Sequence, residues 1–208
     1  MDALPKPYFQ ADGITIYHGD CADLLLLLPV FDLVLTDPPY GHGSKWEGGS
    51  WASDPMYQEA LEWDAQPVAL ELLGGVISKA PRSIIWGGNY YVLPPSRCWL
   101  AWEKAEKMET LADLELAWMN LDRPAKMFKA RRNQDGKREH PTAKPERLMR
   151  WCIEQAGNGV ATIIDPFMGS GKTLLAARNL GRSAVGIEIR ERYCEVAAQS
   201  LSQGVLAL

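Results

Sequence analysis

Short apolar runs recur along the chain and mark the positions of its predicted secondary structure. Six runs have the length of β-strands, and they cover residues 14–18, 32–36, 82–86, 98–102, 160–164 and 183–187. The helical spacing of apolar residues predicts three helices: one with Pro145 in its first turn, and two over residues 173–180 and 191–201. Because strands alternate with helices, the pattern predicts a doubly wound sheet of the α/β class.

The length and composition indicate one globular domain. The chain has 208 residues, of which 47% are hydrophobic and 23% are charged. Its longest apolar stretch, residues 24–30, is too short to span a bilayer, and the first ten residues lack the apolar core of a signal peptide. The four cysteines form no C-x-x-C pair and only three histidines occur. We therefore expect a cytoplasmic protein with reduced core thiols, no membrane span and no metal site.

Two stretches depart from the alternation of strands and helices. Residues 41–54 are rich in Gly, Ser and Trp, and residues 121–140 are polar and basic. Loops of this length in a compact domain are usually either functional or disordered. From Asp122 to Arg150 the chain has ten Lys and Arg against four Asp and Glu, a local charge of +6 in a chain of net charge −4. A basic surface on an acidic protein suits an enzyme that binds a polyanion with one face.

The tetrapeptide Asp37-Pro38-Pro39-Tyr40 directly follows a predicted strand, which is where open α/β sheets bind their ligands. Two prolines fix the backbone and remove two N–H donors, so carbonyl oxygens and the Asp37 carboxylate remain as rigid acceptors. The exocyclic amino group of a base carries two N–H donors, which one carboxylate and one carbonyl would satisfy. The Tyr40 ring offers a surface on which a base can stack. The alternative is a plain Pro-Pro turn with a capping aspartate and a core tyrosine.

A second segment, Asp165–Thr173, reads Asp-Pro-Phe-Met-Gly-Ser-Gly-Lys-Thr and lies between a predicted strand and a predicted helix. Its glycines let the backbone approach a ligand closely. Proline at position 166 excludes a P-loop, and leucine at position 174 excludes a strict dinucleotide fingerprint. Glu188 ends the next strand, nineteen residues after Gly169, where nucleoside-binding units place an acid on the ribose hydroxyls. These features favour a nucleoside without phosphates; an ordinary turn with a surface glutamate is the alternative.

Together with His140-Pro-Thr-Ala-Lys-Pro145, these two segments resemble the amino-methylating (N6-adenine/N4-cytosine) DNA methyltransferases. Their order resembles the circularly permuted beta-type group, in which the catalytic tetrapeptide precedes the cofactor loop. The resemblance implies a Rossmann-like methyltransferase fold: one three-layer αβα domain over residues 1–208, with one antiparallel strand in a mostly parallel sheet. It further implies a small target-recognition insertion near residues 105–140, S-adenosylmethionine as cofactor and double-stranded DNA as partner.

The resemblance also implies roles for individual residues. The residues implied to bind the target base and its amino group are Asp37, Pro38, Pro39 and Tyr40. The residues implied to bind the cofactor form a larger set: Asp20, Cys21, Asp37, His140, Thr142, Lys144, Asp165, Pro166, Phe167, Gly169, Ser170, Gly171, Thr173 and Glu188. Within this set Thr142 and Lys144 are candidates for the methionine carboxylate, and Glu188 for the ribose. Asp20 is a candidate for the adenine amino group, and it is equally suited to cap a helix over residues 21–28. Lys172 departs from the family, whose members often carry a small hydroxyl residue there.

The basic stretch before His140 corresponds to the segment with which this family reads its DNA target. The predicted DNA-binding residues are Lys126, Lys129, Arg131, Arg132, Lys137 and Arg138. We expect contacts to phosphates, with contacts to base edges for a subset; a solvated loop is the alternative. Residues 86–91 and 102–104 either line the pocket or pack in the core. His42 and Lys45 either close over a flipped base or belong to a surface loop.

The expected function is transfer of a methyl group from S-adenosylmethionine to N6 of adenine in DNA, by direct displacement on a base flipped out of the duplex. Asp37 favours adenine, because relatives that methylate N4 of cytosine usually carry serine there. N4-cytosine methylation is the alternative, followed by methylation of RNA or of a protein amide, a nucleotide hydrolase, and a DNA-binding module without activity. The sequence leaves open the recognition sequence, a homodimer and a restriction endonuclease partner. A bacterial or phage-encoded enzyme of the bacterial cytoplasm fits these expectations.

Overall fold

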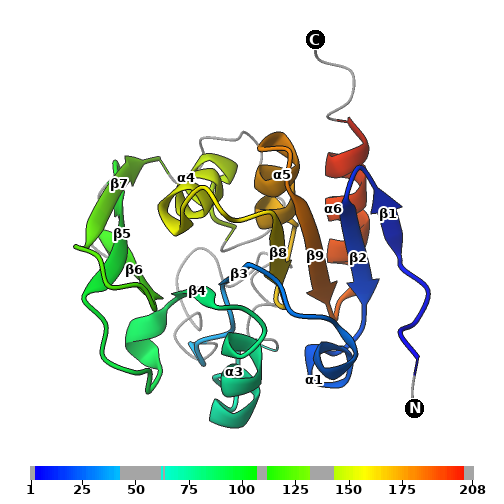
Figure 1. Ribbon diagram of the computed structural model, residues 1–208, viewed down its shortest axis with the longest axis horizontal. Coiled ribbons are helices and arrows are strands. Elements are labelled where there is room, and N and C mark those ends of the chain that lie inside the picture. Colours follow the sequence, from blue (N-terminus) through cyan, green and yellow to red (C-terminus); the bar gives the residue numbers. More distant parts are fainter. Residues whose placement is uncertain (1–2, 43–61, 63, 107–111, 132–142, 204–208) are drawn as a thin grey trace.

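The computed structural model describes residues 3–42, 62, 64–106, 112–131 and 143–203, which are drawn as ribbon in Figure 1. Within these residues nine strands form one sheet in the order β1-β2-β9-β8-β3-β4-β6-β5-β7. The strands are β1 (Phe9–Ala11), β2 (Ile14–His18), β3 (Leu33–Thr36), β4 (Arg82–Trp86), β5 (Cys98–Lys104), β6 (Leu114–Met119), β7 (Lys126–Ala130), β8 (Thr162–Asp165) and β9 (Ser183–Glu188). All six strands predicted from the apolar runs are present, each within two residues of its predicted start.

The sheet is mostly parallel, as predicted. Strands β2, β9, β8, β3 and β4 run side by side in one direction. Two strands run against this direction, where one was expected: β1 at the edge of the sheet, and β6 between β4 and β5. Because β6 is antiparallel to β4 and Trp86 pairs with Ala117, the first residues of β6 extend past the carboxyl end of β4.

Helices cover both faces of the sheet (Figure 1). One layer contains α4 (Glu146–Ala156), α5 (Lys172–Asn179) and α6 (Glu191–Gln203). The other contains α1 (Cys21–Leu24), continued by the 3-10 turn η1 (Leu25–Leu27), and α3 (Leu70–Ile77). The three predicted helices correspond to α4, α5 and α6; Pro145 caps α4 rather than standing in its first turn. The predicted three-layer αβα arrangement is confirmed.

The strands of the sheet bury alternate residues in two separate cores. Leu33 and Leu35 of β3 belong to the core under α4, α5 and α6, whereas Val34 between them belongs to the core under α1 and α3. All three side chains are fully buried. Complete burial of one such side chain contributes roughly 2 kcal/mol. The central strands are therefore held from both faces, and their carboxyl ends are fixed supports for a site.

Residues 105–140, where a small recognition insertion is predicted, contain β6 and β7, and both strands belong to the main sheet. Ala117 and Met119 of β6 are fully buried against the α4 layer. In the described residues, no helix has the length and apolar character that a membrane crossing requires.

Candidate active site

Within the described residues, the predicted catalytic and cofactor-binding residues lie at the carboxyl ends of the parallel strands or in the segments that follow them. His18 of β2 is paired with Glu188 of β9, and Asp165 of β8 is paired with Gly186 of β9. Asp37 follows β3, which lies directly beside β8. Neighbouring parallel strands that end together form one edge, and the arrows of β2 and β9 point toward it in Figure 1. The two predicted centres of chemistry, Asp37–Tyr40 and the loop after β8, thus lie side by side.

Hydrogen bonds from outside the tetrapeptide hold its backbone. The buried Asp64 carboxylate accepts from the backbone N–H of Tyr40 at 2.6 Å and of Gly41 at 2.9 Å. The Pro39 carbonyl accepts from the Tyr91 hydroxyl and from the Val68 N–H. Two external anchors therefore fix the turn in which the sequence predicts rigid acceptors.

The Pro38 carbonyl is the acceptor that the turn leaves available. None of the described residues donates a hydrogen bond to it. Residues 38 and 39 are prolines, so their backbone nitrogens carry a ring carbon in place of a hydrogen and donate no hydrogen bond. The loop can therefore present one carboxylate and one carbonyl to a ligand.

The Tyr40 ring packs against glycine backbone and a second tyrosine. Its hydroxyl donates to the Asp37 carboxylate. Gly87 has φ +66°, and a Cβ at this position would overlap the Tyr40 ring. The Tyr90 ring lies 5.1 Å from the Tyr40 ring, centroid to centroid, at an angle of 31°, and the His42 ring lies 4.4 Å from Tyr90. The three rings form an aromatic cluster beside Asp37, in which Tyr90 is half exposed.

Lys144 lies two residues before the start of α4, and its side chain reaches the tetrapeptide Asp37–Tyr40. Its ammonium forms an ion pair with the Asp37 carboxylate, lies 3.3 Å from the Tyr40 hydroxyl and 3.3 Å from a Glu115 carboxylate oxygen. The Lys144 side chain is 4% exposed. The buried Trp86 ring, whose centroid is 5.1 Å from the ammonium, supports it from one side. Lys144, predicted for the methionine carboxylate, is thus bound here to the predicted catalytic aspartate.

Burial and this ion pair have opposite effects on the Asp37 carboxyl. Burial raises its pKa, the Lys144 ammonium lowers it, and the Glu115 carboxylate raises it again; the net direction is upward. The pKa of Lys144 is raised as well, because the carboxylates of Asp37 and Glu115 outweigh the effect of burial. The pKa of Tyr40 is raised well above its usual range, chiefly by burial and by Asp37. Lys144 therefore stays cationic and Tyr40 stays a hydroxyl donor.

The loop after β8 is built around the buried Asp165. Its carboxylate accepts from the Thr36 hydroxyl at 2.7 Å and from the Phe167 N–H at 3.2 Å. Burial raises the pKa of Asp165 to about 6. Gly171, with φ +75°, is the N-cap residue of α5 and lies so close to α6 that a Cβ would stand 2.7 Å from the Cβ of Ala197. The carboxylate and the glycine shape this loop from within, whatever ligand the loop receives.

Glu188 and Asp20 present carboxylates at the ends of neighbouring strands. The two Glu188 oxygens accept from the N–H of Gly169 at 3.0 Å and of Arg190 at 2.9 Å. Asp20 caps α1 by accepting from the Ala22 N–H with one oxygen. A carboxylate oxygen has more than one acceptor site, so both side chains can also receive hydroxyl or amino donors. These groups fit a nucleoside that carries no phosphate.

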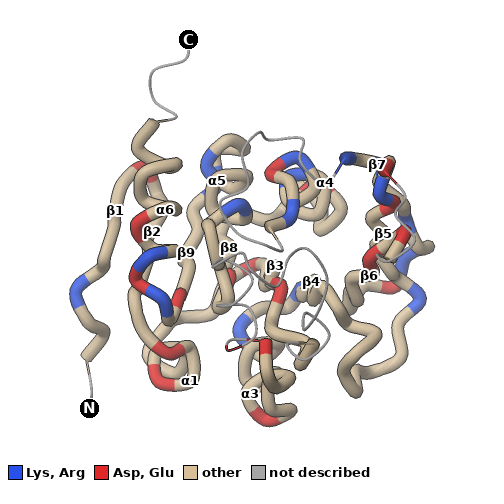
Figure 2. The backbone as a smooth tube through the Cα atoms, turned by 180° about the vertical axis from the view of Figure 1, so that it is seen from behind, with Lys and Arg blue, Asp and Glu red and all other residues tan. Residues whose placement is uncertain are grey.

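Several predicted residues lie outside the described part of the chain. They are His140 and Thr142 of the predicted cofactor set, Arg132, Lys137 and Arg138 of the predicted DNA-binding set, and Lys45. The described members of the DNA-binding set, Lys126, Lys129 and Arg131, are exposed on or beside β7. Figure 2 shows basic and acidic positions interleaved there, because Lys129 pairs with Glu103 and Arg131 with Glu106.

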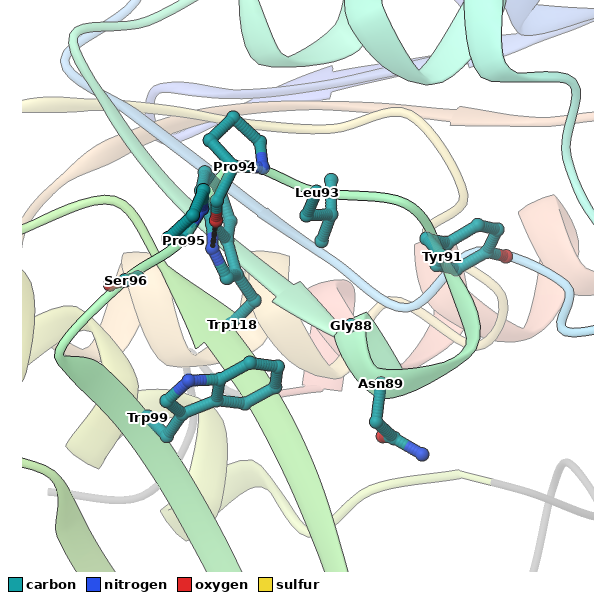
Figure 3. Close-up of a pocket in the computed structure, with 9 residues that line it drawn as sticks. All are labelled: Gly88, Asn89, Tyr91, Leu93, Pro94, Pro95, Ser96, Trp99 and Trp118. Atoms are coloured by element: carbon teal, nitrogen blue, oxygen red, sulfur yellow. Dashed lines mark hydrogen bonds between the residues drawn. The ribbon is translucent and has the colours of Figure 1, made fainter.

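A cavity of about 460 Å³ lies beside the tetrapeptide, between η3 (Gly88–Tyr90) and the start of β5. Its lining residues are Gly88, Asn89, Tyr91, Leu93, Pro94, Pro95, Ser96, Trp99 and Trp118 (Figure 3). The Trp118 N–H donates to the Pro94 carbonyl at 2.8 Å and closes one wall. None of the predicted catalytic, cofactor-binding or DNA-binding residues lines this cavity, but Gly88, Asn89 and Tyr91 of the segment 86–91 do. Tyr91 joins it to the site through the bond to Pro39.

Sequence reasoning missed three residues that the structure brings to the site: Asp64, Tyr91 as an anchor, and Glu115. Tyr91 lay in a segment already expected either to line the pocket or to pack in the core. Of the other residues in those segments, Trp86 and Trp102 are buried in the core. Asp64 and Glu115 carry no local pattern that marks them.

Comparison with known proteins identifies the family to which the chain is similar. The family model described as DNA methylase (N6_N4_Mtase) matches residues 80–199. The type II methyltransferase M.ScaI of Streptomyces caespitosus is 27% identical in an alignment that covers 96% of this chain and 84% of the relative. The family match confirms the predicted class of amino-methylating DNA methyltransferases and supports S-adenosylmethionine as the cofactor. Assignment to the permuted group stays a prediction.

Two solved structures show the same fold. The M1.HpyAVI–SAM complex has a TM-score of 0.61 at 22% identity, over 90% of this chain and 99% of that one. The cytosine-N4-specific PvuII DNA methyltransferase has a TM-score of 0.69 at 16% identity, over 99% of this chain and 92% of that one. Both likenesses confirm the predicted methyltransferase fold, and with the family match they lead to one conclusion: the chain belongs to the N6/N4 DNA methylase family.

Proposed function

We propose that this chain methylates N6 of adenine in double-stranded DNA, in the bacterial cytoplasm, with S-adenosylmethionine as the methyl donor. The observation that carries an amino-group substrate is the acceptor pair made by the Asp37 carboxylate and the Pro38 carbonyl, beside the Tyr40 ring. The choice of adenine rests on Asp37 itself, because the N4-cytosine enzymes of the family that the chain resembles usually carry serine there. Two acceptors match the two N–H donors of an exocyclic amino group, and the ring matches the face of a base. The amino group is inaccessible in stacked DNA, so the base must leave the duplex.

The cofactor is assigned to the neighbouring strand ends. Glu188 would receive the ribose hydroxyls, Asp20 the adenine amino group, and the loop Asp165–Thr173 the amino-acid portion. Bound there, the cofactor supplies a methyl group on a positively charged sulfur. These roles rest on the family resemblance, on the adjacency of the strand ends and on the acceptor capacity of the two carboxylates.

The Asp37 carboxylate and the Pro38 carbonyl accept hydrogen bonds from the two N–H groups of the amino nitrogen and so orient it. The nitrogen lone pair then forms the new N–C bond while the C–S bond breaks and its electrons pass to sulfur. The methylated nitrogen releases one proton, which the Asp37 carboxylate accepts and passes to solvent. Positioning and electrostatics provide the acceleration in this scheme.

The exposed basic residues Lys126, Lys129 and Arg131 are proposed to contact DNA phosphates, together with the basic residues beyond the described part of the chain. Such contacts are independent of sequence and weaken as salt rises. They hold the duplex while the target base is out of the stack.

Product analysis tests the choice of base. The purified protein is incubated with duplex DNA and S-adenosylmethionine, the DNA is digested to nucleosides, and the nucleosides are separated and weighed by mass spectrometry. We expect N6-methyldeoxyadenosine. Recovery of N4-methyldeoxycytidine would replace adenine by cytosine. Methylation of RNA or protein in the absence of any DNA product would overturn the DNA substrate.

A further inference from the structure

Two charged residues stand at the ends of the buried rows of β5 and β6, at the edge where the site lies. On β5 the buried side chains of Cys98, Leu100 and Trp102 point to the α4 layer, and Lys104 is the next position on that face. On β6 Glu115 shares its face with the buried Ala117. Lys104 is 5% exposed and Glu115 is 30% exposed. Charges are seldom buried in this way unless they are paired.

Glu115 bridges two lysines that come from different parts of the chain. One carboxylate oxygen pairs with the Lys104 ammonium, and the other lies 3.3 Å from the Lys144 ammonium. Lys144 in turn pairs with Asp37. Four alternating charges thus run from the end of β5 to the tetrapeptide, and together they are neutral.

The bridge determines where the Lys144 ammonium can lie. A lysine side chain has four rotatable bonds and a point-like charge, so a single partner does not fix it. Here the ammonium contacts a carboxylate on each of two sides, with the Trp86 ring at 5.1 Å. The position of the Lys144 ammonium in turn determines the position of the Asp37 carboxylate that pairs with it.

We infer that Glu115, anchored by Lys104, is a positioning residue that holds Lys144 against Asp37 and so sets the orientation of the carboxylate that faces the target amino group. This inference rests on the proposed function. The competing account is that Glu115 only neutralises the buried Lys104 and has no effect on Asp37.

A double variant separates the two accounts. Lys104→Met with Glu115→Gln removes both charges and leaves no unpaired lysine on β5, so we expect its melting temperature to stay near that of the wild type. Asp122→Asn, which removes an exposed carboxylate paired with Arg97, is the matched control. If Glu115 only neutralises Lys104, the double variant keeps full activity. If it positions Lys144, kcat falls by roughly 10- to 100-fold while KM for DNA stays near the wild-type value.

The pKa of Asp37 gives a second readout, which does not require turnover. The titratable groups that face Asp37 are Lys144, Glu115, Tyr40, Tyr91 and Asp165. Loss of the Glu115 charge alone would lower the Asp37 pKa, whereas loss of a well-placed Lys144 ammonium would raise it. Carboxyl-carbon NMR titration of the wild type and the double variant, assigned with Asp37→Asn, measures the difference.

We expect a higher Asp37 pKa in the double variant and an acid limb of kcat that moves to higher pH. An unchanged or lower Asp37 pKa, or wild-type kcat, would overturn the inference. A wild-type protein that methylates no DNA would refute the proposed function instead, and the titration would still decide the positioning role.

Discussion

The Lys144 ammonium pairs with the Asp37 carboxylate although 107 residues separate them in the sequence. Lys144 stands just before α4, and Asp37 stands just after β3. The fold thereby joins the second and the first of the three sequence motifs through one ion pair. Removal of either charge should therefore change both the stability of the protein and the chemistry of the site.

Lys144→Met should reduce kcat by about 100-fold, because Asp37 loses the cation that orients it. The Asp37 pKa should rise, since Lys144 lowers it in the wild type. An ionised carboxylate is the better acceptor, so activity is lost as pH falls through that pKa, and the acid limb of the pH–kcat profile should move to higher pH. Loss of one partner of a buried pair should also lower stability by about 3 kcal/mol.

Rates of methyl transfer across pH, together with urea unfolding, check this prediction. Lys6→Met, which removes an exposed lysine, is the control and should behave as the wild type. An acid limb that stays in place in Lys144→Met would show that Lys144 does not act on Asp37.

Gly87→Ala should displace the Tyr40 ring and impair catalysis. The new methyl group would overlap the ring, and the φ of +66° adds strain for any residue with a Cβ. Gly181→Ala is a matched control, because Gly181 has the same φ and has no atom within 4 Å of its Cβ position. Both variants should lose about 1 kcal/mol from backbone strain.

Only Gly87→Ala should also lose base binding. Fluorescence of 2-aminopurine at the target position reports whether the base leaves the stack, and the signal on DNA binding should fall in Gly87→Ala alone. Equal losses in the two variants would mean that contact between Gly87 and Tyr40 has no role in the site.

Asp165 should give the protein a component of stability that declines as pH rises. Its pKa in the folded state is about 6 against an ordinary value of 3.8, so the folded state binds the proton more tightly. This contribution is complete below about pH 4 and is lost as pH rises through 6, by roughly 3 kcal/mol at most. Asp165→Asn removes it, so the variant should gain stability relative to the wild type from pH 4 to pH 7.

The contribution of Asp32 to stability depends on pH in the opposite direction. Its carboxylate accepts from the N–H groups of Ala161 and Thr162 and from the Thr162 hydroxyl, and these bonds hold its pKa below the usual range. Its stabilising effect is therefore lost as pH falls. Unfolding of Asp165→Asn and Asp32→Asn between pH 3 and pH 7 should show slopes of opposite sign relative to the wild type. Slopes of the same sign would refute the assignment.

The sequence predicts the central sheet and the site motifs because both depend on local pattern. Apolar runs such as Arg82–Trp86 suffice to identify strands. The pattern failed at α3, where Gly74 and Gly75 interrupt the helical signal, and at β6, where Glu115 breaks an otherwise apolar run. It also failed at the edge strands β1 and β7, which are mostly exposed and carry no apolar run; β7 lies in the stretch 121–140 that was expected to be a loop. Glycine is a weak intrinsic helix former, which explains the failure at α3. At β6 the charged Glu115 is kept in the sheet by its pairing with a distant lysine.

Long-range partners account for what was missed at the site. Asp64 holds Tyr40 from 24 residues away, and Glu115 meets Lys144 only because β6 is antiparallel to β4. Neither relationship leaves a periodic mark in the sequence. By contrast, the glycine turn and the acid at the end of the next strand obey a spacing that a single βαβ unit imposes, so Glu188 could be named before the fold was known.

The dependence of DNA methylation on Asp37 tests the central claim most directly. Genomic DNA from a methylation-deficient bacterial host that expresses either the wild type or Asp37→Ala is read by single-molecule sequencing, with the folding of both proteins verified by thermal unfolding. The account predicts modified adenines in one fixed sequence context with the wild type and none with Asp37→Ala. Methylation by the folded Asp37→Ala protein at a level near that of the wild type would contradict it.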